Sequence, residues 1–105
     1  MINGNGKIKE YNFRCRLKFE GEYLNCKKNG KGKEYNDFGE LKFEGEFLNG
    51  KRNGKGKEYN YNGELQFEGE YLRDKRWNGK GKEYDDNGNL IFEGEYLNGQ
   101  KLNYV

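Results

Sequence analysis

Phe43-Glu-Gly-Glu-Phe-Leu48 is one of four copies of the same hexapeptide in this chain of 105 residues. The other copies carry Tyr in place of the second Phe and occupy residues 19–24, 67–72 and 92–97. A second block, Asn-Gly-Lys-Gly-Lys-Glu-Tyr, follows the first three copies at residues 29–35, 53–59 and 78–84. Self-similarity at a fixed spacing indicates a repeat architecture in which each repeat is one supersecondary unit.

Each block predicts a β-strand. From residue 41 to residue 47, apolar or glycine residues occupy the odd positions and Lys or Glu the even positions, which is the alternation of a strand. A helix is disfavoured because each interior glycine costs about 1 kcal/mol relative to alanine. Asn and Gly between the blocks predict a tight turn, so each repeat of about 24 residues forms one hairpin. We therefore expect an all-β fold, a single-layer antiparallel β-meander of about eight strands twisted into a short rod or trough.

The expected register places the hairpin turn at residues 50–53. Phe47 then covers Gly56 on the neighbouring strand, as aromatic rings do in designed sheets, and Glu46 lies opposite Lys57. The same register elsewhere pairs Tyr23 with Gly32, Tyr71 with Gly81, Glu22 with Lys33, and Glu70 with Lys82. The third repeat carries one extra residue within residues 73–77, which we expect at a loop tip because loops tolerate insertions.

The pattern Phe43-x-Gly-x-Phe-x-Asn-Gly-x-x-x-Gly-x-Gly, with a later turn glycine at Gly63, resembles the MORN repeat. The run from Glu34 to Glu46 is similar to the variant form of that repeat. The resemblance covers residues 5–99 and implies a single array over residues 1–105. Its units are a half-repeat (5–18), three repeats (19–42, 43–66 and 67–91) and a partial repeat (92–105). The atypical ends leave two alternatives, caps of an array or an excerpt from a longer one.

Aromatic residues of the hexapeptides line up on one face of the expected sheet. They form either a self-filled aromatic spine or a shallow groove open to a partner helix or peptide. The candidate groove consists of Phe19, Tyr23, Phe43, Phe47, Phe67, Tyr71, Phe92 and Tyr96.

The two long edges of the meander carry opposite charges. Acidic residues gather at the links between hairpins: Asp37, Glu40, Glu64, Asp85 and Asp86; Arg14 and Arg16 break this pattern near the N-terminus. Basic residues gather at the hairpin tips and form a candidate edge for anionic lipid head groups. This edge consists of Lys27, Lys28, Lys51, Arg52, Arg73, Lys75, Arg76 and Lys101. The alternative interpretation is that these cations are solubilising turn residues.

The composition argues against an enzyme. The chain has no His, Ser or Thr, so it lacks an imidazole base or metal ligand and a hydroxyl nucleophile. We expect no catalytic residue, no cofactor, no metal site and no specific nucleic-acid binding, since no recognition helix is indicated. Cys15 and Cys26 lie at opposite ends of one predicted strand, too far apart for a disulfide. Free thiols and the missing apolar leader predict a cytoplasmic protein, with peripheral membrane attachment as the alternative.

The resemblance implies a non-catalytic scaffold that binds protein. The alternatives are peripheral binding to anionic phospholipid, and an accessory segment of a larger multidomain protein. We also expect weak homo-oligomers through the two terminal strands, which begin near Asn5 and end with residues 102–105, because such strands have unpaired backbone groups.

Overall fold

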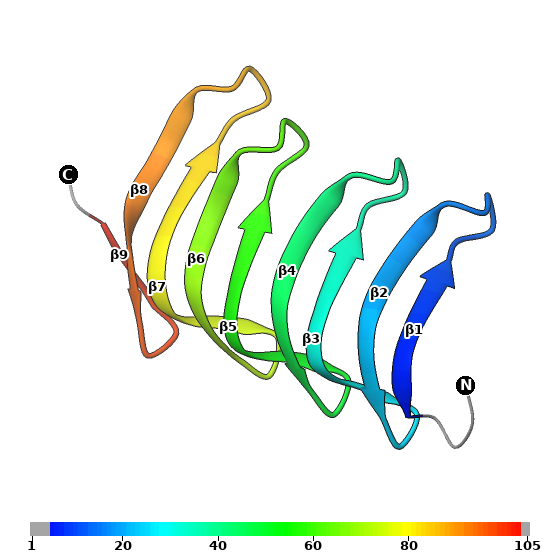
Figure 1. Ribbon diagram of the computed structural model, residues 1–105. Helices are drawn as coiled ribbons and strands as arrows, with labels where there is room; N and C mark the ends of the chain where they lie inside the picture. The colour runs from blue at the N-terminus through cyan, green and yellow to red at the C-terminus, as the bar shows by residue number, and fades with distance from the viewer. Residues whose placement is uncertain (1–4, 104–105) are drawn as a thin grey trace.

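The structure, a computed structural model, describes residues 5–103 and consists of one open sheet. Nine antiparallel strands follow one another in chain order, from β1 at one edge to β9 at the other (Figure 1). They are β1 (Gly6–Tyr11), β2 (Leu17–Leu24), β3 (Lys27–Tyr35), β4 (Leu41–Leu48), β5 (Lys51–Tyr59), β6 (Leu65–Leu72), β7 (Lys75–Tyr84), β8 (Leu90–Leu97) and β9 (Gln100–Asn103). The described residues contain no helix. The predicted all-β meander is confirmed, with one strand more than expected; the last two residues of the predicted terminal strand lie outside the described range.

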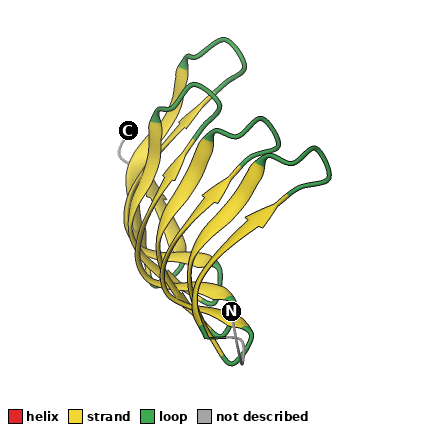
Figure 2. Ribbon diagram, turned by 45° about the vertical axis from the view of Figure 1, so that its right-hand side comes forward, coloured by secondary structure: helices red, strands yellow, loops and turns green. Residues whose placement is uncertain are grey.

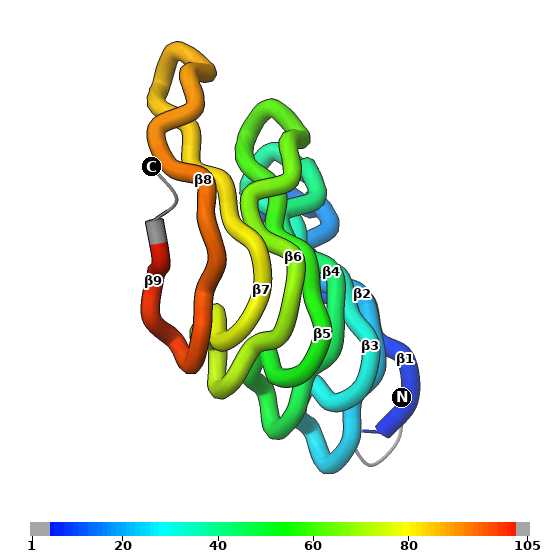
Figure 3. The backbone as a smooth tube through the Cα atoms, turned by 90° about the vertical axis from the view of Figure 1, so that its left-hand side faces the viewer, coloured from blue at the N-terminus to red at the C-terminus, as the bar shows by residue number. Residues whose placement is uncertain are grey.

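The sheet is a curved slab of 51 × 31 × 14 Å. Links between hairpins lie at one end of the strands and hairpin turns at the other (Figure 2). Turns of successive hairpins lie side by side along their edge (Figure 3). The backbone N–H of Gly50 donates to the carbonyl of Lys28, and that of Gly99 to the carbonyl of Trp77, both at 2.9 Å. Each of these turns is thus bonded to the repeat before it.

Hairpin turns contain two residues, not the four expected. In the second repeat they are Asn49 and Gly50, with φ of 51° and 87°. A type I′ turn requires positive φ at both of its central positions, and Asn-Gly is the favoured pair there. Phe47 therefore pairs with Arg52, so the predicted turn at residues 50–53 is wrong.

The predicted cross-strand pairs are wrong for the same reason. Gly56 faces Gly45 and Lys57 faces Glu44, in place of Phe47 and Glu46. The equivalent predictions also fail, because Gly32 faces Gly21, Lys33 faces Glu20, Phe67 faces Gly81, and Glu70 faces Asn78. A bulge near Gly54 takes up the extra residues of β5.

Two side-chain contacts keep Asn53-Gly54 inside β5. The Oδ1 atom of Asn53 accepts a hydrogen bond from the backbone N–H of Arg73 in the next turn, at 3.1 Å. The Oε1 atom of Glu46 accepts one from the backbone N–H of Lys55 beside the bulge, at 2.7 Å. Asn5 and Asn78 bind the turns at Asn25 and Asn98 in the same way. At these three positions, the Asn side chain therefore connects one repeat to the hairpin turn of the next.

The third hairpin accommodates its extra residue in a strand. Its turn is Arg73-Asp74, and β7 has ten residues where β5 has nine. Trp77 lies in β7, so the predicted loop tip over residues 73–77 is wrong. Gly69 consequently faces Gly79, the first glycine of its block, whereas Gly45 faces the second. The row of paired glycines is displaced between β6 and β7.

A row of paired glycines runs across the middle of the sheet, and aromatic rings lie over it. The row comprises Gly21, Gly32, Gly45, Gly56, Gly69 and Gly79. A Cβ on Gly56 would lie 2.6 Å from the ring of Phe43 and 3.1 Å from that of Tyr71. The aromatic cover proposed from the sequence therefore exists, but Phe43 and Tyr71 supply it at Gly56 where Phe47 was expected.

We predict that Gly56→Ala destabilises the fold by about 1–3 kcal/mol, the usual cost of overpacking. The new methyl group would overlap the Phe43 ring, which is itself fully buried. Gly50→Asn is the matched control, since no atom lies within 4 Å of its Cβ position and Asn tolerates its φ of 87°. Urea unfolding of both variants measures the difference, and equal losses would contradict the packing described.

Candidate functional site

The aromatic residues of the predicted groove form a continuous buried spine. Six of the eight are buried, and Phe19, Phe43 and Phe67 have no exposed surface. Seven edge-to-face contacts link the rings, with centroids 5.0–6.3 Å apart. The ring centroids of Phe43 and Phe47 lie 5.4 Å apart although three residues separate them on β4. We call this side of the sheet the aromatic face.

Four basic residues beside the hairpin turns cover the spine. Their charged groups lie 4.2–5.2 Å from the nearest ring centroid, within the range of a cation–π interaction. These residues are Lys28 over Phe19, Arg52 over Phe43, Arg76 over Phe67, and Lys101 over Phe92. Their aliphatic stems supply apolar cover that a single-layer sheet cannot obtain from a second layer.

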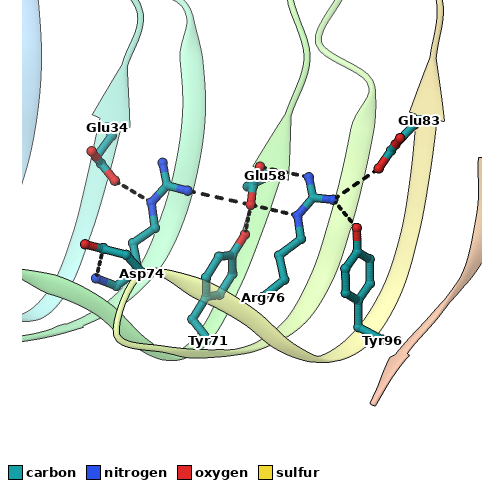
Figure 4. A network of polar contacts seen from close by, with 8 residues as sticks. Glu34, Glu58, Tyr71, Asp74, Arg76, Glu83 and Tyr96 are labelled. Carbon is teal, nitrogen blue, oxygen red and sulfur yellow. Dashed lines mark hydrogen bonds and ion pairs between the residues drawn. The ribbon is translucent and has the colours of Figure 1, made fainter. Parts of the chain in front are cut away.

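Glutamates of β3, β5 and β7 neutralise three of these cations, Arg52, Arg76 and Lys101; Figure 4 shows the part of this network around Glu58. Nε of Arg52 donates to Glu34 at 2.8 Å, and Nη1 of Arg52 lies 3.6 Å from Glu58. Arg76 donates to both carboxylate oxygens of Glu58 at 3.0 Å, a bidentate geometry. Nζ of Lys101 lies 2.8 Å from Glu83. The resulting ion chain runs Glu34, Arg52, Glu58, Arg76, Glu83, Lys101.

Glu58 is the centre of this chain. Burial raises the pKa of its carboxyl, but hydrogen bonds from Arg76 and Tyr71 and the charges of Arg76 and Arg52 outweigh burial and lower the pKa below its ordinary value of 4.5. Burial and the hydrogen bond to Glu58 raise the pKa of the Tyr71 phenol. Arg76 also donates to the hydroxyl of Tyr96 at 2.9 Å. Glu58 is therefore an anion near neutral pH, fixed by three side chains.

These contacts alter both surfaces proposed from the sequence. The aromatic residues of the candidate groove lie largely beneath the chain's own cations. The candidate lipid edge divides into two groups. Lys28, Arg52, Arg76 and Lys101 contact the spine or the ion chain, whereas Lys27, Lys51, Arg73 and Lys75 are exposed at the turns.

The opposite side, which we call the charged face, carries a groove of about 1290 Å³ across β1 to β6. The row of paired glycines forms the middle of this groove. No side chain fills the groove there, because the Cβ positions of these glycines point toward the aromatic face. Lys and Glu alternate in two rows beside the glycines. The row nearer the links is Lys9, Glu20, Lys33, Glu44, Lys57 and Glu68, and the row nearer the turns is Lys7, Glu22, Lys31, Glu46, Lys55 and Glu70.

The links, predicted from the sequence as an acidic edge, also carry exposed aromatic side chains that the sequence interpretation missed. In the second link, the Oδ1 atom of Asn36 accepts hydrogen bonds from the N–H groups of Phe38 and Glu40, each at 3.0 Å. Asn12, Asn60 and Asp85 hold the other links in the same way. Phe13, Phe38 and Tyr61 project from these loops with exposures of 89%, 67% and 75%. The available signal was an aromatic residue inside a four-residue loop that begins with Asn and ends with Gly39, Gly63 or, in the first link, Cys15.

The described residues contain no group of His, Cys, Asp or Glu arranged to hold a metal ion. No helix long and apolar enough to cross a membrane occurs among them. Cys15 and Cys26 are both free and exposed, as predicted.

Comparison with known families connects this architecture to one of them. The family model for the MORN repeat matches residues 19–37, 43–64 and 67–90, which together make up more than half of the chain. The chain therefore belongs to the MORN repeat family. A search of curated proteins finds no significant match.

We predict that Glu58→Gln makes stability less dependent on pH. Because the pKa of Glu58 is lowered in the fold, its contribution is present above pH 4.5 and is lost as pH falls through the folded-state pKa. The variant should lose about 1–3 kcal/mol at neutral pH, the worth of hydrogen bonds to a charged group, and much less near pH 3.

Urea unfolding at both pH values measures this difference, with Glu93→Gln as the control. The Glu93 side chain is 54% exposed and contacts Lys82 only at 3.9 Å. An equal response of the two variants would contradict the role of Glu58.

Proposed function

We propose that this chain is a non-catalytic scaffold that binds a protein partner along the edge formed by the links. The supporting observation is the row of exposed aromatic side chains at Phe13, Phe38 and Tyr61. Soluble proteins seldom expose several large aromatic residues side by side, and aromatic residues are enriched in interface cores.

A hollow of about 510 Å³ lies beside Phe38 and Tyr61. Tyr35 and Tyr59 line it and are held by hydrogen bonds to Glu20 and Glu44, at 2.9 and 2.7 Å. Burial and the Glu44 carboxylate raise the pKa of Tyr59 to about 12, so the phenol stays neutral. A hollow with fixed walls favours binding, because little conformational entropy remains to be lost.

The charge of the same edge restricts the class of partner. Asp37, Glu40, Glu64, Asp85 and Asp86 lie in the second to fourth links, whereas Arg14 and Arg16 lie in the first, and Lys18 and Lys42 line the hollow. An apolar anchor that fits the hollow, flanked by basic residues, complements both features. The partner is therefore a protein segment with an apolar side chain and neighbouring Lys or Arg.

The test uses the intact chain as bait and compares variants on the partner it captures. Phe38→Ser with Tyr61→Ser should weaken binding about 30-fold or more, as expected when hot-spot residues are removed. Leu48→Ser is the matched control, since Leu48 is 50% exposed at the turn end of β4. Equal binding by all three proteins would contradict the use of this edge.

Anionic phospholipid is the second candidate ligand, favoured by the four exposed cations at the turns. Each contributes about 1 kcal/mol near an anionic surface, so four are enough for weak, salt-sensitive attachment. We predict that the chain sediments with phosphatidylserine vesicles at low salt and that Lys27→Glu, Lys51→Glu and Lys75→Glu together abolish this. Lys18→Glu, Lys42→Glu and Lys82→Glu form the control, and equal loss in both triple variants would indicate net charge alone.

A further inference from the structure

The alternating charges of the charged face are complementary to those of a second copy of the same face. Along the row nearer the links, strand pairing sets Lys9 beside Glu20, Lys33 beside Glu44, and Lys57 beside Glu68. Signs therefore alternate over six adjacent strands, beginning with Lys and ending with Glu. The row nearer the turns repeats the same order from Lys7 to Glu70. All six lysines of the two rows are exposed.

A two-fold rotation brings opposite charges together at every position of such a patch. If the axis lies in the contact plane, parallel to the strands and between β3 and β4, each strand meets the strand at the mirrored position of the other copy. Lys9 then meets Glu68 of the other copy, and Lys33 meets Glu44. The same holds along the second row, so all contacts are between unlike charges, and the interface is isologous.

Most glutamate side chains of the two rows are held in place by hydrogen bonds within the same chain. Glu22 and Glu46 accept hydrogen bonds from the backbone N–H groups of Lys31 and Lys55, at 2.6 and 2.7 Å. Glu20 and Glu44 accept them from tyrosine hydroxyls. Four of the six acids in the two rows therefore bring little rotamer entropy to be lost on association.

The displaced register at Trp77 limits the patch. Across β6 and β7, Glu70 faces Asn78, so the row nearer the turns loses its alternation there. Lys80 still faces Glu68, but Lys82 and Glu93 lie outside both rows. Two complete rows are thus confined to β1 to β6, which places the axis between β3 and β4.

We propose that two copies of this chain pair through their charged faces in this antiparallel arrangement. Six strands about 4.8 Å apart and two rows of side chains give a contact of roughly 500 Å² per copy. That size is at the lower end for specific interfaces and corresponds to a weak, transient dimer. Glu20 and Glu44 of this contact also hold Tyr35 and Tyr59 in the hollow beside the links, whereas Phe13, Phe38 and Tyr61 lie in the links outside both rows.

Sedimentation equilibrium of the intact chain at low ionic strength tests the proposal. We expect a monomer–dimer equilibrium that shifts to monomer as salt rises, since charge pairs at this surface are screened. Lys9→Glu and Glu68→Lys should each raise the dissociation constant about tenfold or more, because each change places like charges together twice. An equimolar mixture of the two variants should restore the wild-type constant, since unlike charges meet again in the mixed dimer.

Two further pairs of variants complete the experiment, and circular dichroism checks that each one folds. Lys33→Glu with Glu44→Lys should behave in the same way at the centre of the patch. Lys82→Glu with Glu93→Lys is the control, because these residues form an equivalent ion pair at 3.9 Å outside the two rows. A monomeric wild type at millimolar concentration, equal loss in the control pair, or no restoration in the mixtures would overturn the proposal. Dimers insensitive to salt and to all these variants would also overturn it and would indicate pairing through the terminal strands.

Discussion

A one-layer sheet has to bury aromatic rings without a second layer, and the paired glycines make this possible. At Gly56 the space that a side chain would fill is occupied by the rings of Phe43 and Tyr71. Phe19, Phe43 and Phe67 each reach a ring of the next repeat, so the spine is continuous although no repeat has a core of its own. Stability in such an array comes from contacts between neighbours, which is the general behaviour of repeat proteins.

The cover over the rings explains why so polar a chain can fold. Charged residues make up 36% of the sequence, yet four of the cations pack over the rings of the spine. Arg52 illustrates the arrangement, because it lies over Phe43 and is neutralised by Glu34 and Glu58. The long stem provides apolar contact, and the paired head group avoids the penalty of an isolated buried charge. Hydropathy alone therefore underestimates the core of this protein.

The sequence predicted the strands, the links and the hairpin succession, because these depend on local alternation and on the positions of Asn and Gly. It did not predict the register, because each repeat contains two segments able to form a turn. Asn49-Gly50 and Asn53-Gly54 differ only in their contacts with the neighbouring repeats, where Asn53 binds the next turn. The extra residue near Trp77 could not be placed from the sequence for a similar reason. An added residue can lengthen a loop or shift the register of a strand, and only the pairing of β6 with β7 shows which of the two occurs. The covering cations were found in the sequence but assigned to a free edge, because alternation places a residue on a face and does not show where a long side chain bends.

The residues that define the family and those available for binding are largely different. Glycines, hexapeptide aromatics and the ion chain are occupied inside the sheet, so they specify architecture and leave little surface for a ligand. Phe13, Phe38 and Tyr61 stand in links whose turns are held by the Asx residue that begins each one and by a residue of positive φ at the fourth position. The corresponding link over residues 85–89 has no aromatic residue and folds in the same way. Since these aromatic side chains are not needed for the turn, exposing them costs free energy that the turn itself does not require, and this supports the partner site that we propose at this edge.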